Sequence, residues 1–348
     1  MKKYVNNLIS GVLTLTVFTS LAGCGQTSPS AEEAHKQLFA MDTIMTLTAY
    51  GENGQAGIDA ATTEITTLAA MLDPQDAKST VYAMNNAQGA AVEVPSQITD
   101  MLAAAAKVYG QTGGALDLSV YPLSKLWGFI DLEQTGEGYV PTQAEIDECL
   151  KKLCFDKITV SDGSVTMPSG AEVSFGAVAK GYASDKVMEA MSAAGVANAV
   201  ISLGGNVQTM GTKPDGSKWT VGVENPNDTS SYIGTLSVGQ TAVVTSGSYQ
   251  RYFEKDGKTY HHILDPHTGY PADSGLKSVT ILCSSGVTAD CLSTAMFVLG
   301  TDKALEYWRT YGGFEMLMIT TDDEIICTSG LQGVFTPTNS SSAVTYEK

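Results

Sequence analysis

Apolar residues recur every three or four positions in five parts of the chain, and this spacing predicts helices. In 57–72, for example, Ile58, Ile65 and Leu72 fall on one face. A serine at the start of 96–109 precedes a similar apolar stripe and is a typical helix cap. Helices are expected at 57–72, 96–109, 177–194, 288–299 and 304–311.

Shorter apolar segments bounded by turn residues predict strands. Hairpins are expected over 158–167, around an Asp-Gly turn, and over 315–327. Other strands are expected at 38–50, 199–203, 219–223, 234–238, 242–245, 250–253, 260–263 and 279–283. Helices come between these strands irregularly, without the alternation of a doubly wound sheet. The pattern therefore predicts an α+β protein folded as one compact unit.

The first 24 residues are typical of an export signal. A positive Met-Lys-Lys start is followed by the apolar run 8–22 and by Leu-Ala-Gly before Cys24, the pattern of a lipobox. An uncleaved anchor helix is the alternative, but the apolar run is shorter than the roughly 20 residues that a bilayer requires. We therefore expect diacylated Cys24 to tether an extracytoplasmic protein to the cell membrane.

These patterns divide the chain into four parts. Residues 1–23 are expected to form the signal peptide, and the polar, proline-containing segment 24–37 a flexible stalk. Residues 38–335 would form the globular domain. The polar tail, 336–348, is expected to be disordered.

Composition narrows the functions that this domain can have. The chain is 43% hydrophobic, enough for a large core, and its formal net charge is −17. This charge argues against binding nucleic acid or acidic lipids electrostatically, and an anionic substrate would need a cation or a local basic group. The other five cysteines are odd in number, lack CxxC spacing and are expected to be buried as small hydrophobic residues: Cys149, Cys154, Cys283, Cys291 and Cys327.

Three segments carry candidate chemistry. The polar, turn-rich run 259–271 holds three of the four histidines. Segment 174–182 places small residues where the chain turns into a helix, so that backbone groups can approach a ligand, although an ordinary glycine-rich turn would look the same. Asp290 and Thr294 lie four apart on a predicted helix. Their oxygens suit Mg²⁺, with a helix cap and a solvated face as the alternative.

In their order along residues 39–300, several blocks resemble the FAD:protein FMN transferases, the ApbE-like flavin transferases. Each block is short, but the conserved order of so many makes the resemblance specific. The blocks are Met41-Asp42-Thr43; Asp73 with Ser79 and Asn85; Thr112 to Asp117; Leu126-Trp127-Gly128; Phe175 to Tyr182; Gly204-Gly205-Asn206; Trp219 with Pro226; Thr245 to Tyr249; Thr259 to Pro271; and Thr288 to Ala295.

The resemblance implies a T-fold-like enzyme that binds FAD and Mg²⁺ and cleaves the FAD pyrophosphate. FMN would pass to a threonine or serine hydroxyl of a partner protein, with release of AMP. The metal would be held by Asp290, Thr294 and the backbone carbonyl of Ala177, with Ser293 nearby where relatives often have another carboxylate.

His262 would be the catalytic base that takes the proton of the acceptor hydroxyl, with an imidazole that titrates near neutrality. His261 is the adjacent rival. Successive strand residues face opposite ways, so only one of the two can face the site if the segment is extended. We favour His262 because it precedes Ile-Leu-Asp-Pro as the family's histidine does.

The resemblance also implies a set of residues that contact the flavin. One departure is Ser174, which stands where the family commonly has aspartate and which can donate a hydrogen bond but contributes no charge. Lys180 matches one branch of the family, whereas others carry glutamate. The expected cofactor-binding residues are Met41, Ala115, Leu116, Asp117, Ser174, Lys180, Ser246, Gly247 and Leu264.

The implied partner is an exported protein, a redox-pump subunit or extracellular electron carrier, with a motif like Asp-Gly-x-Ser/Thr-Gly-Ala-Thr. Two other functions stay open from the sequence. A flavin lipoprotein that hydrolyses FAD with water, or only stores flavin, would share the metal and the pocket. A lipid-anchored solute-binding protein would need two similar α/β lobes, which the predicted elements do not show.

Overall fold

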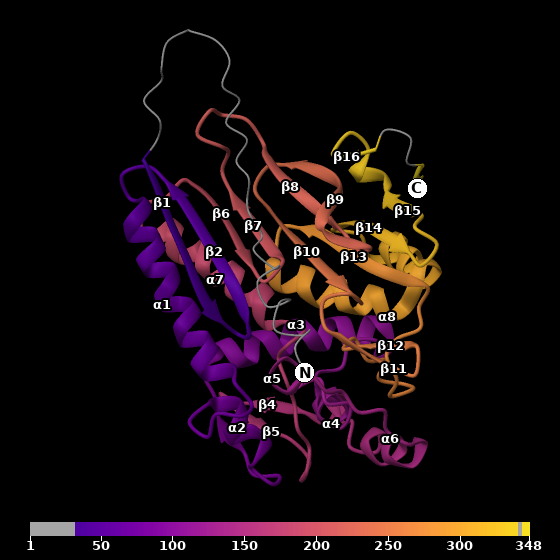
Figure 1. The fold of residues 1–348 in the computed structure, drawn as a ribbon. Helices are drawn as coiled ribbons and strands as arrows, with labels where there is room; N and C mark the ends of the chain where they lie inside the picture. The colour runs from indigo at the N-terminus through magenta and orange to yellow at the C-terminus, as the bar shows by residue number, and fades with distance from the viewer. Residues whose placement is uncertain (1–31, 340–342) are drawn as a thin grey trace, which may run out of the picture.

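A nine-stranded sheet forms the centre of the protein (Figure 1). The computed structural model describes residues 32–339 and 343–348. All neighbouring strands are antiparallel except the last two, which run parallel. In sheet order the strands are β1 (Glu33–Ala40), β2 (Thr43–Tyr50), β6 (Asn198–Leu203), β7 (Asn206–Met210), β10 (Thr241–Gly247), β13 (Leu276–Cys283), β14 (Glu315–Thr320), β15 (Ile325–Thr328) and β17 (Val344–Glu347).

Helices cover one face of this sheet. α1 (Gly54–Leu72) packs on β1 and β2, α7 (Ala179–Ala193) on β7, and α8 (Gly286–Tyr311) on β10 and β13, while α3 (Ser96–Thr112) packs against α8. In α1 the apolar stripe that predicted the helix is the buried face, with Ile58, Ile65 and Leu68 almost fully covered. The main hydrophobic core lies between these helices and the sheet.

A smaller sheet covers part of the other face. It consists of β16 (Phe335–Pro337), β9 (Asp228–Val238) and β8 (Trp219–Asn225), in that order. Residues of β8 alternate between buried and exposed, so Trp219, Val221 and Val223 all point to one side. They form a second core against central-sheet residues such as Val200 and Val243.

A third, aromatic core lies beside the central sheet. Trp127, Phe129 and Phe253 pack together there, and Trp127 Nε1 donates to the carbonyl of Gly269 at 2.9 Å. This bond ties the histidine-rich run to the helical region. The elements around this core are α4 (Tyr121–Leu126), α5 (Leu132–Thr135), α6 (Gln143–Leu150), β11 (Tyr252–Lys255) and β12 (Lys258–His261). The remaining helices and strands are α2 (Thr80–Asn85), β3 (Val92–Glu93), β4 (Thr159–Ser161) and β5 (Ser164–Thr166).

Helices α7 and α8 approach each other closely because glycines stand at their contact. A Cβ atom on Gly181 would lie 2.2 Å from the carbonyl oxygen of Gly286, and one on Gly286 would lie 2.5 Å from the carbonyl oxygen of Gly181. Neither position can hold a side chain without moving a helix. This contact sets the distance between the first turn of α7 and Asp290 of α8.

The predicted α+β class and single compact unit are confirmed, but several boundaries differ. The expected strand 38–50 is a hairpin, because Met41 and Asp42 adopt left-handed backbone angles (φ 50° and 56°) and reverse the chain. Strand β7 was not predicted. The helices expected at 288–299 and 304–311 form α8, which is interrupted only at Gly300 (φ 75°, ψ 172°).

Both ends of the predicted globular domain were placed wrongly. The expected stalk, 24–37, overlaps β1, whose pairing with β2 begins at Glu33. The expected disordered tail, 336–348, contains the end of β16 and also β17, which adds a parallel strand to β15. The proposed signal peptide and Cys24 lie outside the described residues. Within the described part of the chain, no helix is long and apolar enough to cross a membrane.

Candidate active site

Several predicted residues gather at one end of the central sheet, the lower end in Figure 1. The turn at 41–42 joins β1 to β2, and strand pairing places it beside the turn at 204–205 between β6 and β7. A Cβ atom on Gly204 would lie 2.5 Å from Thr43 Oγ1, so this close approach requires glycine. Strand β10 ends nearby at Gly247. We call this region the site end.

An oxygen-rich cluster lies where α8 passes β10. Ser246 Oγ of β10 is 2.8 Å from Ser293 Oγ and 3.3 Å from Thr294 Oγ1 of α8. Asp290 is 3% exposed and Ser293 is fully buried. The structure therefore brings together four of the predicted residues from two elements that are distant in the sequence.

The direction of donation within this cluster follows from counting hydrogens, because each hydroxyl carries only one. Ser293 Oγ donates to the backbone carbonyl of Asp290 at 3.0 Å, so it must accept from Ser246. Ser246 has then used its hydrogen and accepts from Thr294. All three hydroxyl hydrogens are therefore used in hydrogen bonds within the cluster. The remaining lone pairs of Thr294 suit a cation rather than a phosphate.

Gly181 stands in the first turn of α7, where backbone N–H groups have no partner within the helix. Its N–H donates to Asp290 Oδ2 at 2.8 Å. Among the described residues, none donates a hydrogen bond to the Ala177 carbonyl or to Asp290 Oδ1. Both oxygens are therefore available to a ligand.

These donors fit Mg²⁺. A carboxylate, a hydroxyl and a carbonyl are hard oxygen ligands, and Mg²⁺ usually completes its shell with substrate phosphates and waters. Residues 32–339 and 343–348 contain no group of three histidine, cysteine, aspartate or glutamate side chains that could hold a metal. A metal held by Asp290, Thr294 and the Ala177 carbonyl would take the rest of its shell from substrate or water.

A second carboxylate lies at the contact of α7 with α8. It belongs to Asp185 of α7, and both of its oxygens already accept hydrogen bonds. Its Oδ1 accepts from the Gly286 N–H at 2.7 Å and from Gln208 Nε2 at 3.0 Å. Its Oδ2 accepts from the Val287 N–H at 3.0 Å and from the Ser285 hydroxyl at 3.2 Å. Asp185 thus caps the N-terminal end of α8 and pairs with its positive dipole.

His262 directly follows strand β12 and is held by one backbone carbonyl. Its N–H and its Nδ1 lie 3.0 and 3.1 Å from the carbonyl oxygen of Arg251. A carbonyl can only accept, so Nδ1 must carry the proton and Nε2 must carry a lone pair. No described residue forms a hydrogen bond with Nε2. The imidazole is thereby prepared to act as a base.

The expected near-neutral titration of His262 is wrong for the free protein. Burial lowers its pKa to about 3, and the positive charges of Arg251 and Lys180 act in the same direction. The ring is recessed, although part of the residue reaches the surface. His262 is therefore neutral at physiological pH.

His261 has a different environment. Its Nε2 lies 3.2 Å from the carbonyl oxygen of Ala272 and must donate to it, and its ring packs edge-on against Phe297 of α8, with centroids 5.5 Å apart. Its Nδ1 is buried and has no partner among the described residues. His261 thus anchors the hairpin to the main core. The choice of His262 as the base stays a prediction, and this contrast favours it.

The expected flavin contacts form a second group next to the Gly-rich turn. Ala115 and Leu116 are 2% and 1% exposed. Burial raises the pKa of Asp117, whereas the N–H and hydroxyl of Ser119, both donating at 2.6 Å, lower it. Leu118 lies between Asp117 and Ser119, and its carbonyl accepts from the Ser174 N–H at 3.0 Å. This bond joins segment 115–119 to the turn that begins at Ser174.

Ser174 itself is partly used by the turn that it begins. Its Oγ accepts from the Gly176 N–H at 3.3 Å, so its hydrogen remains free to donate to a ligand. Leu264, two residues beyond His262, is buried and bridges to Pro271. Met41, Ser246 and Gly247 stand at the same end of the central sheet, with β2, β6 and β7 between the turn at 41–42 and β10. Hydrogen bonds join segments 115–119 and 174, 181 and 290, and 246 and 293–294.

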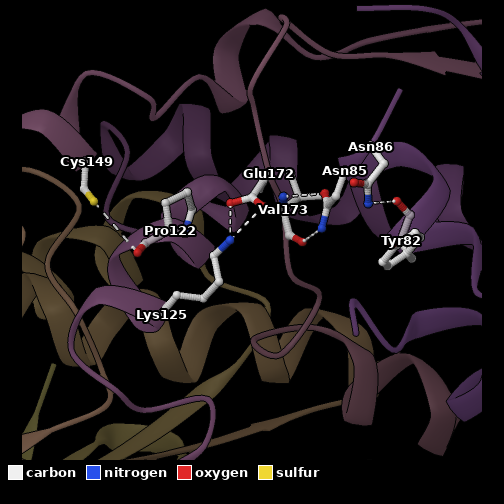
Figure 2. A network of polar contacts seen from close by, with 8 residues as sticks. All are labelled: Tyr82, Asn85, Asn86, Pro122, Lys125, Cys149, Glu172 and Val173. Atoms are coloured by element: carbon white, nitrogen blue, oxygen red, sulfur yellow. Dashed lines mark hydrogen bonds and ion pairs between the residues drawn. The ribbon is translucent and has the colours of Figure 1, made fainter. Parts of the chain in front are cut away.

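Figure 2 shows the polar network that holds the extended segment leading to Ser174. The Asn85 side chain donates to the Val173 carbonyl at 3.0 Å and accepts from the Val173 N–H at 2.8 Å, as a neighbouring strand would. Lys125 forms an ion pair with Glu172. Asn85 belonged to a block singled out in the sequence, and its role here is to fix the site loop.

Sequence reasoning missed two residues that shape the site. Gly181 supplies the N–H that binds Asp290, and Arg251 supplies the carbonyl that selects the tautomer of His262. A glycine inside the first turn of a predicted helix was the available signal for Gly181. No signal was available for Arg251, because every residue has a backbone carbonyl and the sequence does not show which one binds the histidine.

Comparison with known proteins shows the family of this chain. A sequence model of the ApbE family matches residues 41–318. A protein of Klebsiella pneumoniae (strain 342) named "FAD:protein FMN transferase" is 35% identical over 280 residues, which cover 78% of this chain and 84% of that protein. A protein of Treponema pallidum (strain Nichols) with the same name is 30% identical over 343 residues, covering 92% of this chain and 93% of its own length.

Solved structures of the same kind share the fold. The ApbE protein from Thermotoga maritima superposes with a TM-score of 0.81 at 30% identity, covering 87% of this chain and 99% of that one. The flavin transferase ApbE from Vibrio cholerae gives a TM-score of 0.79 at 26% identity, with the same coverage of both chains.

Proposed function

This chain belongs to the ApbE family, and on that premise we propose that it is a Mg²⁺-dependent FAD:protein FMN transferase. It would move FMN from FAD to a serine or threonine hydroxyl of an exported protein and release AMP. The relatives named above carry the coarser part of this proposal, the transfer of FMN from FAD to a protein.

One observation supports the finer part. Near the contact of α7 with α8, three oxygens keep lone pairs and receive no hydrogen bond from a described residue: the Ala177 carbonyl, Asp290 Oδ1 and Thr294 Oγ1. An unneutralised buried carboxylate is costly, so such a group is expected to have a ligand in the working enzyme. A divalent cation bridging to a pyrophosphate would satisfy all three. It would also explain how an acidic protein binds an anionic substrate.

In the proposed reaction the acceptor hydroxyl oxygen attacks the phosphorus of the FMN half of FAD. The bond from this phosphorus to the oxygen shared with the AMP half breaks as the new ester bond forms. His262 Nε2 takes the hydroxyl proton, and AMP leaves with the bridging oxygen. When bound, Mg²⁺ neutralises the charge of the pyrophosphate.

The low pKa of His262 in the free protein is compatible with this role. A neutral imidazole is the form that accepts a proton, and His262 is already neutral. Binding of the negatively charged phosphates nearby raises the proton affinity of the ring, because an opposite charge favours the protonated form. The Arg251 carbonyl keeps Nε2 rather than Nδ1 as the accepting atom.

The test is reconstitution of the purified soluble domain with FAD, MgCl₂ and an acceptor domain that contains Asp-Gly-x-Thr-Gly-Ala-Thr. Flavin fluorescence in a denaturing gel, a mass increase equal to one FMN less one water, and stoichiometric AMP would support transfer. FMN and AMP released into solution, with an unmodified acceptor, would instead support the alternative of FAD hydrolysis. No reaction with any of several such acceptors would contradict both.

We further propose that the mature protein is extracytoplasmic and tethered to the membrane by lipid on Cys24. This proposal rests on the sequence pattern around Cys24 alone. Cys24→Ala should abolish incorporation of labelled fatty acid and leave an uncleaved precursor or a soluble protein. Unchanged lipid labelling of the variant would show that the lipobox assignment is wrong.

A further inference from the structure

Five side-chain atoms are buried without a hydrogen-bond partner among the described residues. They are Asn206 Nδ2, Gln208 Oε1, His261 Nδ1, Ser274 Oγ and Ser278 Oγ. An unpaired buried polar atom destabilises the folded state, so each one requires a reason. Asn206 stands at the site end and is only 2% exposed, and neither atom of its amide forms a hydrogen bond with a described residue.

The Asn206 side chain faces the helices that cover the central sheet. Asn206 is the first residue of β7 and pairs with Leu203 of β6, whose side chain lies in the main core between the sheet and the helices. Gln208, two residues later and on the same face, donates to Asp185 of α7 at 3.0 Å. Asn206 therefore points toward α7 and not toward the smaller sheet.

Asn206 is level with the first turn of α7. The strand that follows α7, β6, starts at the end of the sheet opposite the turn at 41–42, so α7 and β7 both run away from the site end. Gly181 comes one helical turn before Asp185, an advance of about 6 Å, and Asn206 comes two strand residues before Gln208, an advance of about 7 Å. The amide thus lies beside the turn whose N–H groups hold the site carboxylate.

On its other side Asn206 neighbours the oxygen cluster. β7 pairs with β10 through Val207 and Val243, so Asn206 and Ser246 lie on the same face of adjacent strands, as diagonal neighbours. Such neighbours are about 7–8 Å apart. No hydrogen bond restrains the Asn206 amide, and rotation about its Cβ–Cγ bond is broad for asparagine. The amide can therefore turn toward a ligand bound next to this cluster.

We infer that the side-chain N–H of Asn206 binds an oxygen of the FAD pyrophosphate and positions it beside the metal donors. The three hydroxyls of the oxygen cluster have used their hydrogens among themselves and on a backbone carbonyl, so they cannot donate to a phosphate. An unpaired N–H next to them supplies the donor that an anionic oxygen requires. The inference rests on the proposed function, because it assumes that FAD binds at this site.

The test measures binding in MgCl₂ without an acceptor protein. Asn206→Leu keeps the branched shape of the side chain and removes the amide. The dissociation constants for FAD and for ADP, which both contain a pyrophosphate, should rise roughly 10- to 100-fold. That for riboflavin, which has no phosphate, should change less than twofold. The melting temperature of the free protein should stay equal or rise, because an unpaired buried donor is removed.

A smaller replacement, Asn206→Ala, gives the same comparison if the leucine variant does not fold, and circular dichroism checks both. Unchanged affinity for FAD and ADP in the folded variants would overturn the inference. A loss of riboflavin affinity as large as the loss of ADP affinity would also overturn it, because a contact with phosphate cannot explain such a result.

Ser278→Ala is the matched control. Ser278 is 1% exposed and its hydroxyl also lacks a partner, but it pairs with Ile319, whose side chain lies in the second core on the opposite face of the sheet. This variant should leave the affinities for FAD and ADP unchanged. If the wild-type protein binds neither FAD nor ADP, the proposed function fails. If it binds both and the Asn206 variants bind them equally well, only the role of Asn206 fails.

Discussion

Two carboxylates lie where α7 meets α8, and they differ in role: one stabilises the structure, and the other is assigned to metal binding. Asp185 and Asp290 both bind backbone N–H groups where α7 meets α8. Asp185 receives four donors and has no capacity left, whereas Asp290 receives one, from Gly181. The first fixes the start of α8, and the second keeps one oxygen, Oδ1, without a donor among the described residues.

The adjacent histidines differ in the same way. His261 packs on Phe297 and binds Ala272, so its ring joins the hairpin to the core. His262 uses only Nδ1, on the Arg251 carbonyl, and keeps the lone pair of Nε2 free. His261 also has an unpaired nitrogen, Nδ1, but this atom is buried. In both pairs we assign chemistry to the residue whose unused lone pair is not enclosed by the protein.

The largest effect should come from the histidines. His262→Ala should lower the single-turnover rate of FMN transfer by roughly 10²- to 10⁴-fold, the usual scale of general base catalysis. FAD affinity, measured by flavin fluorescence, should stay nearly unchanged. The residual rate should rise with pH as hydroxide replaces the lost base.

His261→Ala is the matched control. It should transfer FMN at a rate close to that of the wild type, with a modest loss of stability because the contacts with Phe297 and Ala272 disappear. If His261→Ala loses transfer while His262→Ala keeps it, the roles of the two histidines must be exchanged.

Asp290→Asn should lower the transfer rate by roughly 10²- to 10³-fold, because a metal contact to developing phosphate charge is worth several kcal/mol. Asparagine keeps the size of the side chain and can still accept from the Gly181 N–H. The melting temperature should therefore change little. Full activity of this variant in the presence of a chelator would exclude the assigned Mg²⁺ site.

Asp185→Ala should act on stability instead. It leaves several donors at the start of α8 without a partner, at a cost of about 2–3 kcal/mol in the free energy of unfolding. Urea titration followed by circular dichroism measures this. Below the unfolding transition, the variant should retain transfer activity within a few-fold of the wild type. A catalytic loss comparable to that of Asp290→Asn would remove the distinction between the two carboxylates.

The smallest effect concerns pH. Because the pKa of His262 in the folded protein lies below its usual value, protons favour the unfolded state as the pH falls from about 6.5 toward 3. The stability contribution of a neutral His262 is thus complete above about pH 6.5 and declines below it. Chemical denaturation of His262→Ala at pH 7 and 5 should show a smaller loss than the wild type shows. An equal or larger loss would mean that His262 is not held neutral.

Much of the fold followed from local patterns. The apolar stripes of α1 and α3 predicted helices that the structure contains, because one face of each packs on the core. The turn at 41–42 was missed because it contains no glycine, the residue that most often adopts left-handed backbone angles. Strand β7 was missed because the segment after Gly204-Gly205 mixes polar and apolar residues, all of which are buried.

The site could be predicted only in part. A resemblance in ordered blocks named Asp290, Thr294 and Ala177, but the placement of Asp290 depends on Gly181, whose N–H donates to Asp290 Oδ2. That bond joins residues 109 positions apart, and no local pattern predicts it. The pKa of His262 was also beyond sequence reasoning, because it depends on burial and on charges from Arg251 and Lys180.

Metal binding without turnover separates the two carboxylates. Calorimetric titration of Mg²⁺ into FAD-saturated protein should give a dissociation constant at least tenfold weaker for Asp290→Asn than for the wild type. The dissociation constant for Asp185→Asn, measured where that variant is folded, should lie within threefold of the wild type. Equal Mg²⁺ affinity in the wild type and Asp290→Asn, or a greater loss in Asp185→Asn, would contradict the assignment of the free carboxylate to the metal.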